Sequence, residues 1–278
     1  MNFRSTEKEK LPQDDAHASA AGTRPEGTHD EDEAAHRVQE MFTRIAPRYD
    51  FLNHLLSLSF DRPWRTRTAR RFRHILARPD AHALDLCCGT GDLTFSLERA
   101  AARTGQNHAS IFGSDFVPPM LSLARKKAKL ADSRAAFLAG DALSLPFAGN
   151  SFDLLTAAFG FRNLANYERG LREIFRVLRP GGELGILEFS EPRGKVVAPL
   201  YRFYFEKILP RIGNVISGNS TAYSYLPASV AKFPAPEELS TWITHAGFTE
   251  VSFTPWMFGA VVLHTARKPT NFARNVKN

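Results

Sequence analysis

Apolar and polar positions alternate with two different periods along the middle of the chain. Short apolar runs with a two-residue period predict strands at 81–86, 111–114, 136–138, 152–158 and 184–189. Between these runs, apolar residues spaced three and four apart predict helices at 93–102, at 119–130, and from Asn166, a helix-capping residue, to Leu178. Strands that alternate with helices over short connections indicate a parallel sheet covered on both faces.

Two flanking regions extend this pattern. Pro63 suits the first turn of a helix, whose apolar face begins with Trp64. We interpret the opposite face as solvent-exposed, because it carries the basic residues Arg65, Arg67, Arg70, Arg71 and Arg73. Near the end, Pro236 starts a helix that Gly247 stops, and two last strands are expected around Val251 and Val262.

Charge divides the chain into regions. Residues 1–34 hold nine acids and four bases and have no sustained apolar period, so we predict a disordered acidic tail. Residues 35–268 form one predicted α/β domain, and 269–278 a C-terminal tail. With +7 on the whole chain, the part beyond the acidic tail carries about +12, which suggests an anionic partner: a membrane surface, a nucleic acid or a phosphorylated ligand.

The cysteine content and the apolar runs limit where in the cell the protein is expected. The two cysteines, Cys87 and Cys88, are adjacent, so they form neither a useful disulfide loop nor a zinc site, and no metal is expected. No apolar run approaches the roughly 20 residues that span a bilayer. The N-terminus has no apolar signal-peptide core. We expect a cytoplasmic protein that at most rests on the inner face of the membrane.

Three segments at predicted strand ends have the residues of a nucleoside site. The first runs from Asp85 to Asp92 and contains Gly89 and Gly91, which allow a tight turn and a close ligand approach. Asp115 ends the second strand, where a carboxylate accepts both ribose hydroxyls of an adenosine. Gly140-Asp141-Ala142 follows the third strand, where Asp141 is placed to accept a hydrogen bond from the adenine amino group.

The glycine-rich segment favours S-adenosylmethionine over NAD. A dinucleotide fold requires a third glycine three residues after Gly91, and that position is Thr94. Asp92 is a poor neighbour for a pyrophosphate, whereas an acid is acceptable beside a cationic sulfonium and its amino group.

The sequence resembles class I methyltransferases and, more narrowly, the UbiE/MenG quinone C-methyltransferases over about residues 38–268. The motifs that carry the resemblance are Tyr49-Asp50-x-x-Asn53-x-x-x-Ser57 with Arg62 and Trp64, the segment Asp85 to Asp92, Phe159-Gly160-Phe161-Arg162-Asn163, Arg176 to Gly182 with Glu188-Phe189-Ser190, and Ala222-Tyr223-x-Tyr225-Leu226-Pro227 with Ser229, Val230, Phe233 and Pro234. It implies a Rossmann-like, mostly parallel seven-stranded sheet with an antiparallel last strand.

The resemblance also implies S-adenosylmethionine as cofactor. The candidate cofactor-binding residues are Asp85, Gly89, Thr90, Gly91, Asp115, Asp141, Ala142 and Ala158. Ala158 stands where the family often has Ser, and alanine lacks the hydroxyl that the serine would offer. Asp61 and Ser59 stand where the family often has His and Gly, near the expected substrate mouth.

The implied reaction is C-methylation of the ring of a prenylated quinol, with demethylmenaquinol favoured. The benzoquinol of ubiquinone biosynthesis, or another small lipid or phenol, is an alternative. The candidate catalytic residues are Arg162, Asn163, Tyr49 and Asp50. Arg162 and Asn163 would orient the ring oxygens, unless Arg162 is only an ion-paired loop residue. Tyr49 and Asp50 would line the pocket and are candidates for the general base.

Further sequence features bear on surface contacts and on the substrate class. Segment 199–216 mixes aromatic, aliphatic and basic residues, which is typical of an interfacial helix that makes transient membrane-surface contact, or of a lid. Nucleic acid is not an expected substrate, because Ala158-Phe159-Gly160-Phe161 replaces the Pro-Pro-aromatic tetrad of amino-directed nucleic-acid methyltransferases. A non-catalytic quinone or lipid carrier is disfavoured by the intact glycine motif and Asp115, and a homo-oligomer is left open.

Overall fold

The fold is a seven-stranded sheet in the order β3-β2-β1-β4-β5-β7-β6. In this computed structural model, the described residues are 22–23, 25, 27–50, 60–105, 108–192, 194, 198–199, 203 and 228–270. The strands are β1 (His82–Leu86), β2 (Ser110–Asp115), β3 (Ala136–Ala139), β4 (Phe152–Ala158), β5 (Leu178–Phe189), β6 (Thr249–Trp256) and β7 (Val261–Arg267). Strands β1 to β5 pair in parallel, and β7 runs antiparallel to both of its neighbours. The predicted fold class is confirmed.

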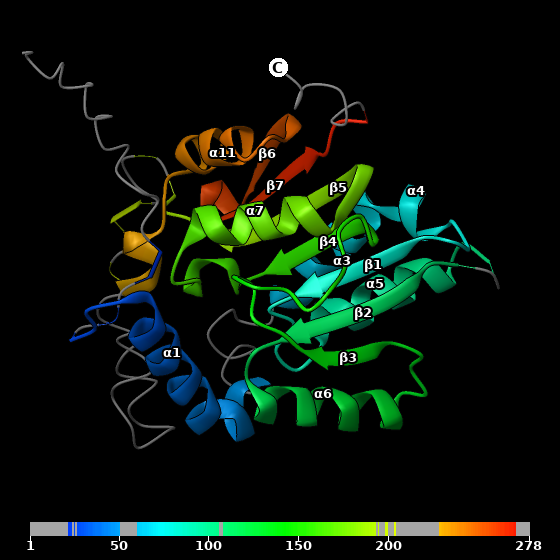
Figure 1. The fold of residues 1–278 in the computed structure, drawn as a ribbon, viewed down its shortest axis with the longest axis horizontal. Helices are drawn as coiled ribbons and strands as arrows, with labels where there is room; N and C mark the ends of the chain where they lie inside the picture. Colours follow the sequence, from blue (N-terminus) through cyan, green and yellow to red (C-terminus); the bar gives the residue numbers. More distant parts are fainter. Residues whose placement is uncertain are drawn as a thin grey trace, which may run out of the picture.

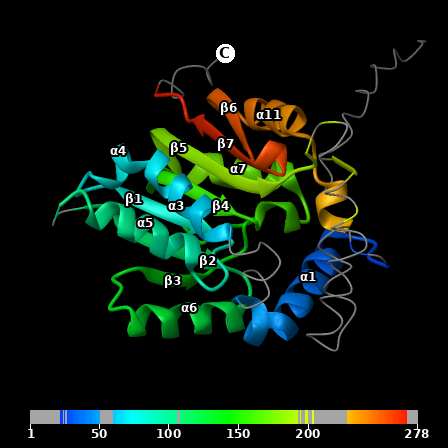
Figure 2. The ribbon, with the colours of Figure 1, turned by 180° about the vertical axis from the view of Figure 1, so that it is seen from behind.

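Helices cover both faces of the sheet, as Figures 1 and 2 show. One face carries α3 (Asp61–Arg71), α4 (Arg73–Leu76) and α5 (Asp92–Ala102), and the other carries α7 (Tyr167–Val177) and α11 (Pro236–His245). Helix α6 (Pro118–Leu130) packs against β2 and β3. Helix α1 (Glu31–Ile45) lies beyond the ends to which β1, β2 and β4 point. Among the described residues, no helix has the length and apolar character that crossing a membrane requires.

The predicted caps explain where several elements begin and end. The Asn166 side chain accepts a hydrogen bond from the Arg169 backbone N–H and starts α7. Gly247, with φ at 101°, follows α11 as a C-terminal cap.

Strand β5 begins six residues before the predicted start, so Pro180-Gly181-Gly182 lies inside the strand. Gly181 has φ at 81°, and the pairing of β4 with β5 shifts register in this region.

The N-terminal boundary differs from the predicted one. Helix α1 begins at Glu31, and the Asp30 side chain caps it by accepting a hydrogen bond from the Glu33 backbone N–H. Ala34 is fully buried in the main core. The Thr23 N–H donates to the Leu164 carbonyl, 2.8 Å away. The predicted tail of residues 1–34 therefore extends too far toward the C-terminus, because its last part packs against segments that are distant in sequence. Residues 1–21 lie outside the described part of the chain.

The arginine face of α3 is only partly solvent-exposed. Arg67, Arg70, Arg71 and Arg73 are exposed, as expected. Arg65 is buried, at 7% exposure, and pairs with Asp61 one turn earlier and with Asp92 at 3.4 Å. The solvent-exposed interpretation is thus wrong for Arg65, because one of its two acidic partners, Asp92, comes from another helix.

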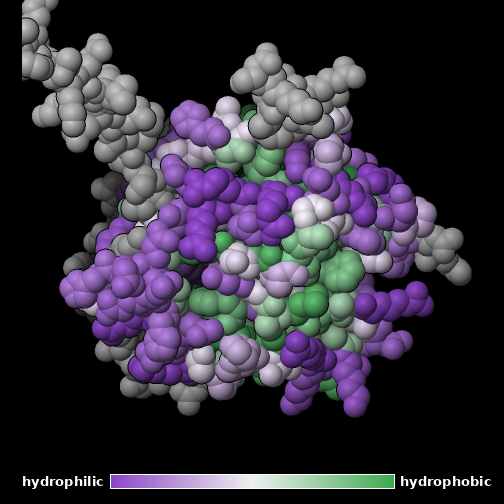
Figure 3. Space-filling model, in the orientation of Figure 1, coloured by the Kyte–Doolittle hydropathy of each residue, from purple (hydrophilic) through white to green (hydrophobic). Residues whose placement is uncertain are grey.

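The surface on the side of α7 is mostly hydrophilic. Figure 3 shows hydrophilic residues over α7 and α1, with apolar residues at the surface in the region of β2 and β3. Strand β3 is the edge of the sheet, and three of its four residues are exposed.

Candidate cofactor and active site

A cavity lies at the carboxyl ends of β1, β2 and β4, where ligands bind in open α/β sheets. The space at these strand ends amounts to about 690 Å³, part of which is open solvent. Its apolar lining includes Phe42, Phe116, Val117, Met120, Leu143 and Phe159, and its polar side chains are Tyr49, Asp115, Asp141 and Asn163. Candidate residues from five separate sequence segments thus converge on one space.

The glycine-rich loop after β1 forms one wall of the cavity. Cys87, Gly89 and Gly91 have φ of 53°, 55° and 87°, a conformation that favours glycine at the last two positions. A Cβ on Gly91 would lie 2.9 Å from the Phe137 ring, so a side chain there would force the ring to move. Gly89 lines the cavity and faces the Tyr49 ring, which would be 3.6 Å from an added Cβ.

Asp115, at the end of β2, is hydrogen-bonded to the glycine-rich loop after β1. Its carboxylate accepts hydrogen bonds from the backbone N–H of Gly89 (2.8 Å) and of Val117 (2.9 Å). Burial raises the pKa of Asp115, and these backbone hydrogen bonds oppose the rise. A carboxylate has about four acceptor positions, so two bonds leave capacity for the two hydroxyls of a ribose. Asp115 therefore fits its predicted role.

The loop after β3 supplies the second acceptor. Asp141 and Ala142 both line the cavity, and the Asp141 side chain accepts a hydrogen bond from the Leu143 N–H at 2.9 Å. A Cβ on Gly140 would lie 2.7 Å from the Ser114 Oγ, so glycine brings this loop close to β2. Two carboxylates on an otherwise apolar wall match the hydroxyls and amino group of an adenosine. The residues present therefore fit S-adenosylmethionine.

Four candidate cofactor residues do not line the cavity. Asp85, 1% exposed, accepts hydrogen bonds from the Thr94 hydroxyl (2.7 Å) and the Thr156 hydroxyl (3.2 Å), and burial raises its pKa to about 7. It therefore fixes α5 and β4 relative to β1. Thr90, Gly91 and Ala158 lie beside the cavity lining, so a direct cofactor contact for them stays a prediction.

Arg162 is a buried member of an ion pair rather than part of the cavity wall. Its guanidinium lies 3.0 Å from the Glu188 carboxylate, and its backbone N–H donates to the same carboxylate at 3.1 Å. The guanidinium also donates to the Phe159 carbonyl and, at 3.4 Å, to the Ser229 hydroxyl. The alternative of an ion-paired loop residue thus describes Arg162, and the predicted contact with ring oxygens lacks structural support.

The Arg162 ion pair shapes the loop after β4, which does line the cavity through Phe159, Gly160 and Asn163. Burial raises the pKa of Glu188, and the Arg162 charge opposes the rise. Phe159 has φ at 58°, a strained conformation for a bulky residue. A Cβ on Gly160 would lie 2.4 Å from the Cys87 Cβ, so the loops after β1 and β4 touch where only glycine fits.

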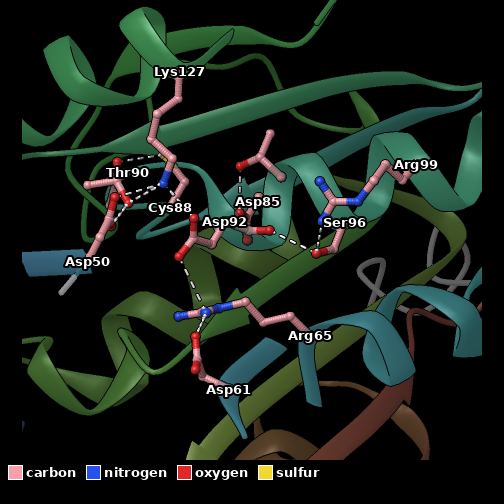
Figure 4. A network of polar contacts seen from close by, with 12 residues as sticks. Asp50, Asp61, Arg65, Asp85, Cys88, Thr90, Asp92, Ser96, Arg99 and Lys127 are labelled. Atoms are coloured by element: carbon pink, nitrogen blue, oxygen red, sulfur yellow. Dashed lines mark hydrogen bonds and ion pairs between the residues drawn. The ribbon is translucent and has the colours of Figure 1, made fainter. Parts of the chain in front are cut away.

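Tyr49 and Asp50 lie next to each other but face different partners. Tyr49 lines the cavity, whereas Asp50 accepts hydrogen bonds from the Thr90 hydroxyl (2.5 Å) and the Lys127 ammonium (3.0 Å), as Figure 4 shows. Both Asp50 oxygens are engaged in this network, which does not favour Asp50 as the general base. Asn53 of the same motif lies outside the described residues.

Sequence reasoning missed the contribution of α1. Ala35 and Phe42 line the cavity, so α1 closes its outer side. The apolar spacing of Ala35, Val38 and Phe42 is the signal that could have found this face. Met120 of α6 and Phe116 after β2 were also missed, although Phe116 follows directly after the predicted ribose-binding Asp115.

The fold and the site define a class I methyltransferase architecture. A SAM-dependent methyltransferase of Thermotoga maritima, a possible histamine N-methyltransferase, superposes with a TM-score of 0.56 at 20% identity and covers 83% of this chain and 99% of its own. The putative methyltransferase in complex with the Haloferax volcanii Trm112 activator gives 0.56 at 18% identity, over 84% and 97% of the chains. These likenesses show the fold.

Residues 30–268 match the ubiE/COQ5 methyltransferase family, and the chain belongs to that family. It is therefore an S-adenosylmethionine-dependent methyltransferase. The demethylmenaquinone methyltransferase of Thermus thermophilus is 46% identical over 82% of this chain and 100% of its own length. That of Deinococcus radiodurans is 48% identical over 79% and 88%. The ubiquinone/menaquinone biosynthesis C-methyltransferase UbiE of Geotalea daltonii is 40% identical over 85% and 98%.

Proposed function

We propose that the protein methylates a ring carbon of a prenylated quinol and converts demethylmenaquinol to menaquinol. The observation that carries the proposal is the identity of 46–48% to two demethylmenaquinone methyltransferases, over nearly the full length of those proteins. The apolar lining of the cavity is consistent with a ring substrate. The benzoquinol reaction is the second candidate, because a relative at 40% identity carries a name that covers both pathways.

The chain's own residues position and shield the reactants. When bound, S-adenosylmethionine supplies an electrophilic methyl group on a sulfonium. Asp115 and Asp141 hold the adenosine part, and the Gly89 loop accommodates the rest against β1. Phe159, Gly160 and Asn163 line the same space, so their loop would orient the substrate ring toward the methyl group of the bound cofactor.

The polar groups for the ring oxygens come from the cavity wall. Asn163 and Tyr49 are the uncharged polar side chains there, so we assign to both a hydrogen bond that orients a ring oxygen. Arg162 acts indirectly, because its contacts with Glu188 and with the Phe159 carbonyl hold the loop that carries Asn163.

The lipid tail of such a substrate implies contact with a membrane surface, and the β6–β7 turn supports it. Val261 pairs with Phe189, so this turn lies at the same end of the sheet as the cavity. Met257 and Phe258 in the turn are 44% and 77% exposed and have φ of 48° and 59°. Exposed apolar side chains held in a strained backbone indicate an interaction surface.

Aromatic side chains connect this turn to the cavity. Phe159 of the cavity wall is 6.1 Å from Trp64, ring centre to ring centre, and belongs to one apolar cluster with Trp256, the residue before the turn. The Arg67 guanidinium lies 5.0 Å from the centre of the Trp256 ring. Aromatic residues beside exposed arginines suit the interface of an anionic bilayer. The predicted membrane segment 199–216 lies largely outside the described residues.

Two experiments test the proposal. The first measures methyl transfer to short-chain demethylmenaquinol and to its benzoquinol counterpart. Faster transfer to the naphthoquinol supports the assignment, a preference for the benzoquinol contradicts its substrate half, and transfer to neither refutes it.

The second experiment measures sedimentation with anionic vesicles. Met257 and Phe258 are replaced together by Asn, which tolerates positive φ, and exposed Leu130 on α6 is replaced by Asn as control. We expect the double variant alone to lose vesicle binding while it keeps activity on the short-chain quinol. Equal binding of all three proteins would contradict the assigned surface.

A further inference from the structure

Lys127 of α6 places one ammonium among oxygens from two different segments, as Figure 4 shows. Its Nζ lies 2.5 Å from Asp92 Oδ1, 3.0 Å from Asp50 Oδ2 and 3.0 Å from the Thr90 hydroxyl. The Thr90 hydroxyl in turn donates to Asp50 Oδ1 at 2.5 Å. An ammonium has three N–H donors, so this arrangement uses all of them.

The network differs from an ordinary surface ion pair. The Lys127, Asp50 and Asp92 side chains are 32%, 37% and 22% exposed, so solvent screens them only in part. Asp92 continues to Arg65 at 3.4 Å, and Arg65 is buried and paired with Asp61. Charges of alternating sign thus connect α3, α5, α6 and residue 50. Removal of the Lys127 ammonium would take away the cation that bridges the Asp50 and Asp92 carboxylates, and Arg65 would remain as a cation beside Asp92.

The two segments that Lys127 joins both reach the cofactor cavity. Tyr49, directly before Asp50, and Gly89, directly before Thr90, line the cavity and face each other. Lys127 lies outside the cavity lining, so it acts on the cofactor only through these segments.

We infer that Lys127 is a positioning residue for cofactor binding, because its ammonium fixes the Tyr49–Asp50 segment against the Gly89–Asp92 loop. The ion pairs set the width of the cavity beside Gly89. This role rests on the assignment of the cavity to S-adenosylmethionine, and it assigns Asp50 to the same network rather than to proton transfer.

Substitution of Lys127 by Gln removes the charge and keeps most of the side-chain length. We expect S-adenosylmethionine binding, measured by calorimetry, to weaken about three- to tenfold, the range of a partly exposed charged network. Lys127→Arg keeps the charge and should bind within about twofold of the wild type. The control is Lys126→Gln, an exposed lysine one position earlier on the same helix, which should leave binding unchanged.

A second readout needs no cofactor. Amide hydrogen exchange of the cofactor-free protein should become faster at residues 89–92 in Lys127→Gln, because the loop loses its tie to Asp50, and should stay unchanged in β5. Asp50→Asn should produce the same local change. The double variant should be no weaker in binding than Lys127→Gln alone, because both substitutions break the same contact.

The outcomes separate this inference from the proposed function. A dissociation constant of Lys127→Gln within twofold of the wild type, or unchanged exchange at residues 89–92, would overturn the inference. Additive losses in the double variant would also overturn it. A wild type that does not bind S-adenosylmethionine would count against the proposed function, and the exchange measurement would then decide the role of Lys127 by itself.

Discussion

Asp115→Ala tests the cofactor site most directly, and the structure gives it two separate consequences. The carboxylate lines the cavity, where it is assigned to the ribose hydroxyls. The same carboxylate accepts hydrogen bonds from the Gly89 and Val117 backbone N–H groups. Alanine therefore removes a cofactor contact and leaves two buried backbone donors without their partner.

The two effects change different quantities, the cofactor dissociation constant and the free energy of unfolding. Loss of charge-assisted hydrogen bonds to the ribose costs on the order of 1.5–3 kcal/mol, or about 10- to 150-fold in the dissociation constant. Two orphaned buried donors cost about 2–6 kcal/mol of unfolding free energy in total. For a chain of this size, that lowers the Tm by about 4–24 °C. Asp115→Asn keeps one acceptor and the volume, so its stability should fall between alanine and wild type.

Calorimetry with S-adenosylmethionine and a thermal melt measure the two effects independently. The control is Asp80→Ala, which removes a carboxylate whose side chain is 80% exposed, and both quantities should stay as in the wild type. A dissociation constant of Asp115→Ala within about twofold of the wild type would refute the assignment to the ribose. An unchanged Tm would show that the hydrogen bonds to Gly89 and Val117 do not hold the loop.

Three further predictions follow from the buried contacts. Deletion of residues 1–34 should lower the Tm of the protein by several degrees relative to deletion of residues 1–21, because only the longer deletion removes the Asp30 cap and the burial of Ala34; equal melts would show that this segment adds no stability. For Asp85→Asn, the free energy of unfolding in urea, taken relative to that of the wild type, should increase by about 2–4 kcal/mol as the pH rises from 4 to 8. The reason is that the folded-state pKa of Asp85, about 7, lies above its unfolded value, so the wild type loses stability as the pH rises through that window, and a pH-independent difference would contradict the raised pKa. Arg162→Met should cost about 3–5 kcal/mol of unfolding free energy, because it strands the buried Glu188 carboxylate, and Arg162→Met with Glu188→Leu should recover much of that loss; a double variant as unstable as the single one would show that the pair acts through more than its charges.

The strands and most helix ends could be predicted because their signals are local. The two-residue period of buried apolar positions gave β1, β2 and β4 within one residue of their observed bounds. Caps such as Asn166 depend on hydrogen bonds within one helical turn. Asp115, Asp141 and Gly89 were found for a related reason, because topology alone brings the ends of parallel strands to one edge.

The errors concern residues whose partners are distant in sequence. Arg65 lies on the polar side of α3 by its helical position, but Asp92 comes from another helix and holds it in the interior. Arg162 similarly pairs with Glu188 on β5, so its place in a loop motif did not reveal its burial. The polar composition before residue 34 indicated a tail, yet contacts to Leu164 and Asn166 order its last part. Local periodicity contains no information about such contacts.

The strand ends of this site share one construction principle, which affects how mutants should be interpreted. Asp85 in β1, Asp115 in β2 and Glu188 in β5 are buried carboxylates, and each has a pKa raised by burial. Each accepts hydrogen bonds from another segment of the fold: Asp85 from Thr94 of α5 and Thr156 of β4, Asp115 from Gly89 and Val117, and Glu188 from Arg162. The protein thus bears a desolvation cost at three positions to hold these elements and loops in place before the cofactor binds. Of the three, only Asp115 lines the described cavity. An activity assay alone would therefore mark all three as essential. Measurement of cofactor affinity and unfolding free energy on each alanine variant separates the one carboxylate that binds from the two that position: at Asp85 and Glu188 the loss of affinity should track the loss of stability, whereas at Asp115 it should exceed it.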